Sequence, residues 1–116
     1  MNRFKELKVW QKSVELSTEI YRLTEKIPNV ERYGLISQMT RCAVSIPSNI
    51  AEGSGRNTKG EFNQFLGIAL GSSFELETQI IIARNLNYIK SEVANTCLSS
   101  LHEIQSMLFG LKKSLK

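Results

Sequence analysis

The segment with the clearest potential for binding chemistry is residues 53–60, Gly-Ser-Gly-Arg-Asn-Thr-Lys-Gly. It carries two cations, Arg56 and Lys59, and Thr58 is followed three residues later by Glu61. That spacing is typical of a capping box, so a helix is expected to start here, and a helix N-terminus attracts anions. The segment lacks the Gly-Lys-Ser/Thr order of a P-loop. Two interpretations stay open: a phosphate-binding loop, or a capped turn that uses glycine for a positive φ.

A second group of polar residues falls at helical spacing, and we expect it to share one edge of a helix. Its members are Arg41, Ser45, Ser48 and Glu52, bordered by Gln38 and Asn49. The edge is either a partner surface or a solvated face.

Basic residues outside the loop add a further cluster, Lys8 and Lys12, one helical turn apart. Together with Arg41, Arg56 and Lys59 they are the predicted contacts for nucleic-acid phosphates. The alternative is that Arg41 and Arg56 form salt bridges with Glu52 or Glu61 and brace the glycine loop.

Catalytic and metal-binding chemistry is hard to assemble from this sequence. All eleven acidic residues are glutamate, and His102 is the one histidine. No serine or cysteine has a partner base beyond that histidine, and no Glu-x-x-His motif of a di-iron bundle occurs. We predict no catalytic residue, no metal and no cofactor. Cys42 and Cys97, far apart among apolar residues, are expected to be free, buried thiols.

Four segments with a helical apolar period must position these residues, at about 6–26, 30–52, 58–87 and 91–115. With short loops and 116 residues they predict one all-α domain, residues 1–116, folded as an antiparallel up-down-up-down four-helix bundle. Pro47 should kink the second helix or split it in two near residues 46–48, with Ser48 beside the freed carbonyl of Ala43. Gly53 and Gly55 should end it.

Apolar residues extend further round the third helix than one core requires, which predicts a homo-oligomer. Gly67 and Gly71, four residues apart, permit close helix approach. The apolar stretches are too short to span a bilayer and no signal-peptide core precedes them, so we expect a cytoplasmic protein without a membrane partner.

The stretch Leu35–Arg56 resembles the signature of the four-helix-bundle proteins encoded in intervening sequences of 23S ribosomal RNA genes. The matching core is Gln38 and Arg41, then Ser-Ile-Pro-Ser-Asn-Ile-Ala-Glu-Gly from Ser45 to Gly53, and Arg56. The resemblance implies a bacterial protein with no established enzymatic activity. It also implies structural roles for the motif residues Gln38, Pro47, Asn49, Glu52 and Gly53. The accessory variability protein of diversity-generating retroelements is similar; it is a basic pentamer that works with nucleic acid, and this favours five copies here.

These observations predict a non-enzymatic, oligomeric binding module for structured RNA or a nucleoprotein partner. The net charge of +4 is compatible with weak attraction of anions. The alternative is a protein-interaction or structural oligomer that binds no nucleic acid.

Overall fold

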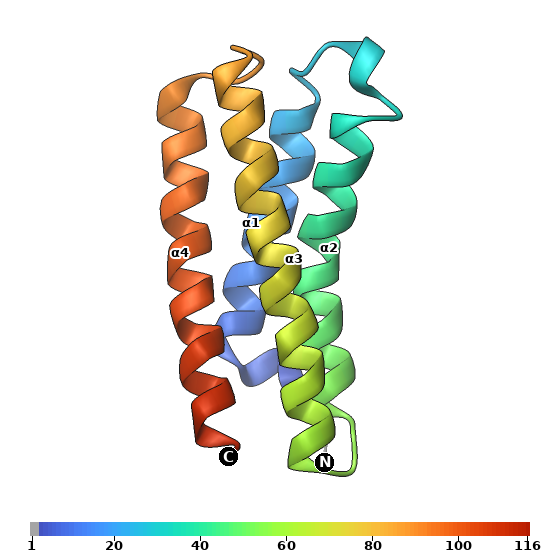
Figure 1. Cartoon of the computed structure of the whole chain (residues 1–116), viewed down its shortest axis with the longest axis vertical. Coiled ribbons are helices and arrows are strands. Elements are labelled where there is room, and N and C mark those ends of the chain that lie inside the picture. The colour runs from blue at the N-terminus through green and yellow to red at the C-terminus, as the bar shows by residue number, and fades with distance from the viewer. Residues whose placement is uncertain (1–2) are drawn as a thin grey trace.

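The computed structural model describes residues 3–116 and consists of four helices and two short 3-10 turns. The elements are η1 (Phe4–Glu6), α1 (Lys8–Thr24), η2 (Asn29–Glu31), α2 (Leu35–Ser54), α3 (Lys59–Asn85) and α4 (Ser91–Ser114). No strand occurs among the described residues. The helices lie side by side in an elongated bundle of 43 × 24 × 20 Å (Figure 1). The all-α four-helix prediction is confirmed.

Contacts between the helices establish their directions. Lys112, near the end of α4, donates to Asn63 near the start of α3, whereas Arg84, near the end of α3, donates to Asn95 near the start of α4. Ser45 of α2 bonds to Ser72 of α3. The two α3–α4 bonds show that these helices are antiparallel, and the course of the chain in Figure 1 shows that α1, α2 and α3 also alternate in direction. The described chain begins and ends at the end of the bundle that carries the α2–α3 turn.

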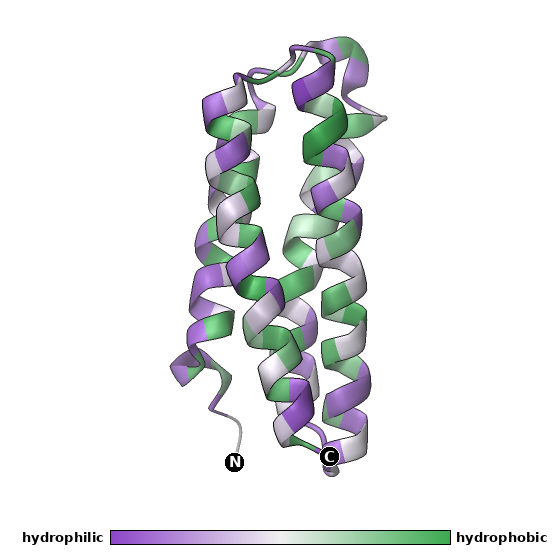
Figure 2. Ribbon diagram, turned by 60° about the vertical axis from the view of Figure 1, so that its left-hand side comes forward, coloured by the Kyte–Doolittle hydropathy of each residue, from purple (hydrophilic) through white to green (hydrophobic). Residues whose placement is uncertain are grey.

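The core is built from the apolar stripe of each helix, and its largest fully buried side chains include Ile20, Met39, Ile46, Leu76 and Leu101. Polar residues lie mainly outside this stripe, so hydropathy changes around each helix (Figure 2). Burial of this apolar surface is the main force that holds four helices together, because the helices themselves are only marginally stable in water.

Helix α2 passes through Pro47 without interruption. Of the two outcomes expected at this proline, a kink or a split into two helices, the split is therefore wrong. Proline removes the N–H that would bond to the Ala43 carbonyl. Ser17 of α1 donates its hydroxyl to that carbonyl at 2.7 Å, while also lying 2.8 Å from the Ser13 carbonyl of its own helix. The neighbour that we expected, Ser48, is exposed. A side chain from another helix therefore compensates for the missing backbone bond.

Gly53 lies inside α2, so the prediction that it ends the helix is wrong; Gly55 is the C-cap, as predicted. A Cβ at Gly53 would lie 2.6 Å from the Phe65 Cβ and 2.9 Å from the Phe62 Cδ1 of α3. Glycine is needed here for close approach of two helices. No glycine in the described chain has a positive φ, so the positive-φ part of the turn interpretation is also wrong.

Helix α2 begins at Leu35, five residues later than the sequence pattern indicated. Residues 29–31 instead form η2, where Glu31 makes two contacts. Its Oε1 accepts from the Leu35 N–H at 3.3 Å, and its Oε2 accepts from the Tyr88 hydroxyl at 3.0 Å. The second bond ties this turn to the α3–α4 connection, which a local sequence pattern does not reveal.

The spacing of Gly67 and Gly71 permits close helix approach, but no helix of the bundle packs closely against either residue. A Cβ at Gly71 would meet nothing within 4 Å, and one at Gly67 would meet only the Lys112 Nζ, at 3.5 Å. Gly67, Gly71 and Phe74 fall at positions i, i+4 and i+7 and therefore share one face of α3. The apolar side chains of Ile68 and Phe74 on α3 and of Phe109 on α4 are 52%, 45% and 54% exposed.

Helix α3 is long and apolar enough to cross a membrane by length and composition alone. Buried helices of soluble bundles pass the same test, and α3 contributes Leu66, Leu76 and Ile80 to the fully buried core. The hydropathy of α3 is high because the helix carries apolar residues both on its buried face and on its exposed face.

Candidate nucleic-acid interface

The α2–α3 turn is built by the predicted capping interaction. The Glu61 N–H donates to the Thr58 Oγ1 at 3.1 Å, and the same hydroxyl lies 3.1 Å from the Glu61 Oε1. Thr58 is the N-cap in extended conformation, and α3 starts at Lys59. The turn therefore holds Lys59 in the first turn of a well-anchored helix.

Arg56, in the same turn, is engaged within the protein. Its Nη2 lies 2.9 Å from the Glu52 Oε2, and its guanidinium lies over the Phe65 ring, 4.8 Å from the centroid. This is the salt bridge that we considered as the alternative to phosphate binding. The pair is exposed, so it holds the turn while the guanidinium still borders solvent.

Of the two cations predicted on α1, Lys8 is exposed and has no ion pair within the described chain, whereas Lys12 is half-buried. The Lys12 Nζ lies 3.0 Å from the Glu103 Oε1 of α4. Lys12 therefore ties α1 to α4, and Lys8 is the more accessible of the two.

Arg41 lies in the middle of α2, away from the turn, and forms no ion pair with the described residues. The polar residues beside Arg41, predicted to share one edge of α2, do not all point to solvent. The Asn49 Nδ2 donates to the Ser45 carbonyl at 2.8 Å, and the Ser45 and Ser72 hydroxyls are 2.8 Å apart. Ser45 and Asn49 thus face the α2–α3 seam, where Gln38 also meets α3 at Gln79.

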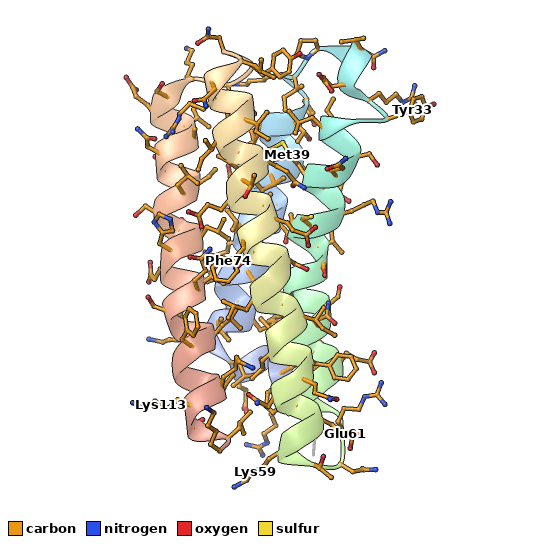
Figure 3. The ribbon with its side chains drawn as sticks, viewed as in Figure 1. Tyr33, Met39, Lys59, Glu61, Phe74 and Lys113 are labelled. Atoms are coloured by element: carbon orange, nitrogen blue, oxygen red, sulfur yellow. The ribbon has the colours of Figure 1, made fainter. Side chains whose placement is uncertain are left out.

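Basic residues from four parts of the chain gather at the end of the bundle that contains both termini. We call this region the basic end; it comprises Arg3, Lys5, Lys8, Arg56, Lys59, Lys112, Lys113 and Lys116. Its carboxylates are Glu6, Glu52 and Glu61. The first two pair with Arg3 and Arg56, and Glu61 belongs to the cap. Figure 3 shows Lys59 and Lys113 at this end.

The lysines of the last turn of α4 were missed as site residues by the sequence reasoning. Lys112 donates to the carbonyl oxygen and to the Oδ1 of Asn63, both at 3.1 Å, which holds the end of α4 against α3. Lys113 and Lys116 are exposed. The signal was available, because antiparallel helices place the end of the fourth beside the start of the third.

His102, the single histidine, lies on the surface between α3 and α4. Its Nε2 is 3.1 Å from the Glu77 Oε2, and the Gln105 amide donates to the Glu77 Oε1 at 2.9 Å. Hydrogen bonds from Gln105 and then His102 hold the pKa of Glu77 below its usual value. This pair acts between two helices, and the described residues contain no group of three metal-ligating side chains.

Comparison with known proteins identifies a matching family model and a similar crystal structure. A family model described as 23S rRNA-intervening sequence protein matches residues 5–110. A crystal structure of a protein of unknown function from the S23 ribosomal protein family of Bacteroides thetaiotaomicron is similar, with a TM-score of 0.80 and 25% identity. The similarity covers 90% of this chain and 98% of that one. No curated protein matches significantly.

Proposed function

The chain belongs to the family of 23S rRNA-intervening sequence proteins, and we propose that it is a non-enzymatic, oligomeric module that binds structured RNA through its basic end. The family description links these proteins to ribosomal RNA genes and names no reaction. The concentration of positive charge at one end of the bundle is the observation that carries the proposal.

The charge distribution favours a polyanion over a small anion. Lys59 extends from the start of α3, whereas Lys113 and Lys116 extend from the end of α4, and none of the three forms an ion pair in the described chain. Several separate, unpaired cations suit successive phosphates along a backbone, where each contact releases a counterion and contributes weakly. Arg56 stabilises the α2–α3 turn through its salt bridge with Glu52. The part of its charge that Glu52 does not neutralise adds to the positive potential of the basic end.

Assembly into a homo-oligomer would multiply these contacts. Phe74 is half exposed on the face of α3 that also carries Gly67 and Gly71, and Ile68 of α3 and Phe109 of α4 are exposed as well. Exposed apolar side chains beside residues without side chains favour the approach of another helix. A second copy of the chain is the proposed occupant, and the sequence resemblance favours five copies. Repetition of the basic end in one assembly raises the effective concentration of phosphate contacts.

A protein-interaction oligomer without RNA is the second candidate, and the same apolar surface favours it. The two functions differ in their dependence on salt. Binding through phosphates weakens linearly in log salt, whereas an apolar interface does not weaken in this way.

The test is a salt titration of binding to an RNA hairpin, monitored by fluorescence anisotropy. The variant Lys59→Ala with Lys113→Ala removes two cations from the basic end. We expect weaker binding and a slope in log salt that is shallower by about 0.7–0.9 per lost contact in each engaged subunit.

The matched control is Lys26→Ala with Lys90→Ala, which removes the same charge at the opposite end of the bundle. It should retain nearly wild-type affinity. Equal losses in both variants would mean that only net charge matters, and no affinity at low salt in the assembled oligomer would remove RNA from the function.

A further inference from the structure

A polar recess lies between α2 and α3, outside the basic end. Its volume is about 310 Å³, and its walls include Arg41, Cys42 and Ser45 of α2 and Ser72, Glu75 and Gln79 of α3. That volume is at the lower limit of small-molecule sites, of about 300 Å³. The hydrogen bond between Ser45 and Ser72 crosses the seam and fixes one wall, and Asn49 holds Ser45 through both its carbonyl and its hydroxyl.

Gln79 has an unsatisfied amide in this wall. The side chain is 7% exposed, and its Oε1 has no hydrogen-bond partner. Its Nε2 has only two long contacts, 3.5 Å to the Gln38 Oε1 and 3.5 Å to the Cys42 Sγ. If the Gln79 amide is rotated so that Oε1 and Nε2 exchange places, Nε2 becomes the atom without a partner. Buried polar groups are normally paired, so the missing bond at this amide is left to a water or a ligand in the recess.

Arg41 and Glu75 face the same recess with opposite charges, yet neither forms an ion pair with the described residues. Both are exposed at its rim. Burial of the nearby Cys42 thiol raises its pKa, so this residue is a neutral part of the wall. The recess therefore offers a forked donor on the α2 side, and carboxylate and amide acceptors on the α3 side.

A guanine base has the complementary pattern. Its O6 and N7 are adjacent acceptors, which arginine binds in a bidentate manner, and its N1–H and N2–H₂ are adjacent donors, which suit a carboxylate. Adenine presents an amino group beside N7 and would oppose the arginine fork, and uracil lacks the paired donors. Unpaired RNA bases are commonly read along these edges by protein side chains.

We infer that the α2–α3 recess binds an unpaired guanine, with Arg41 on its O6 and N7, Glu75 on its N1–H and N2–H₂, and Gln79 accepting a further N–H after its amide turns. The inference rests on the proposed RNA-binding function when the guanine is part of RNA. The same chemistry would accept a free guanine nucleotide, and the experiment separates these sources.

The experiment measures the affinities of wild-type protein for two labelled RNAs, a nonamer of uridine and the same nonamer with one central guanosine. Unlabelled GMP serves as a competitor. We expect the guanosine-containing RNA to bind about tenfold more tightly, as one good bidentate contact provides. GMP should remove this preference without displacing the uridine nonamer from the basic end.

Glu75→Gln should reduce the preference to about one, because an amide cannot accept two N–H groups in the same way, and it should leave the uridine nonamer bound at least as well. Glu25→Gln removes the same charge from an exposed site elsewhere and should keep the preference. Gln79→Leu should also abolish the preference while raising the melting temperature, since the unsatisfied amide is gone. If Gln79 had a purely structural role, its replacement would not lower the guanine preference while raising the melting temperature.

Each further outcome has one meaning. Salt-dependent binding of both RNAs with equal affinity in the wild type would overturn the guanine site and leave the proposed function standing. GMP bound by wild type and not by Glu75→Gln, without RNA binding, would support the guanine site for a free nucleotide and contradict the proposed function. Absence of both RNA and GMP binding would refute both.

Discussion

Ser17 supplies the hydrogen bond that Pro47 removes from α2. Sequence alone locates the problem, because a proline inside a helical pattern always leaves a carbonyl without its usual donor. It does not locate the solution, because the donor lies 26 residues earlier, on another helix. The residues next to Pro47 in the sequence suggested Ser48 as the donor, but Ser48 is exposed to solvent.

We expect Ser17→Ala to lower the free energy of unfolding by about 1–3 kcal/mol, since the buried Ala43 carbonyl loses its external donor. In a Pro47→Ala background the loss should be smaller, because residue 47 then provides an N–H to the same carbonyl. Urea denaturation of the four proteins in this cycle measures the coupling.

Ser13→Ala is a suitable control for this cycle, as Ser13 is also buried but donates only to the Trp10 carbonyl within α1. Its cost should be the same with and without Pro47. If Ser17→Ala also costs the same in both backgrounds, the hydroxyl does not compensate for the proline.

At the scale of elements, features that depend on neighbouring residues were predictable and features that depend on distant ones were not. The Thr58–Glu61 cap was predicted and lies where expected, because both partners belong to one helical turn. The late start of α2 was missed, since Glu31 is held by Tyr88, which lies 57 residues further along the chain. The role of Gly53 was misjudged for the same reason: its conformation is helical, and only the facing α3 requires a missing side chain.

Gly53→Ala should therefore destabilise the protein by about 1–3 kcal/mol, because the new methyl group overlaps Phe65 and Phe62 and forces α2 and α3 apart. Gly110→Ala is the matched control in α4, where a Cβ would meet nothing within 4 Å. That change should stabilise the helix by about 0.5–1 kcal/mol. Thermal unfolding followed by circular dichroism compares them, and a Gly53→Ala protein as stable as wild type would disprove the steric role.

At the scale of the whole molecule, the order of four helices was predictable from apolar periodicity and short loops. The basic end was not recognised, although each of its lysines is visible in the sequence. Its charge is modest in any one segment and becomes concentrated only when the chain folds back three times. The α2–α3 recess was missed in part, because Arg41 and Gln38 were noted but their partners on α3 were not.

Assembly is testable at this scale. Light scattering coupled to gel filtration should give a mass several times the 13.1 kDa of one chain. Phe74→Ser combined with Phe109→Ser should reduce it towards a single chain with unchanged helix content, because both rings are about half exposed and contribute little to the core. Tyr33→Ser, which alters an 87% exposed side chain in the η2–α2 connection, should leave the mass unchanged. A wild-type mass near 13.1 kDa would contradict the oligomer.

The position of the basic end also determines how the molecule meets a polyanion from a distance. At physiological ionic strength the Debye length is about 8 Å, a small fraction of the 43 Å long axis. The rest of the chain carries seven Lys/Arg residues against eight Glu residues. Those of its charges that lie more than a Debye length away are screened and do not weaken the attraction at the basic end. Within this short range a polyanion would be attracted mainly to the positive tip, and the resulting torque would turn the rod end-on just before contact. Encounters would begin already oriented, with the α2–α3 turn and the two chain termini leading.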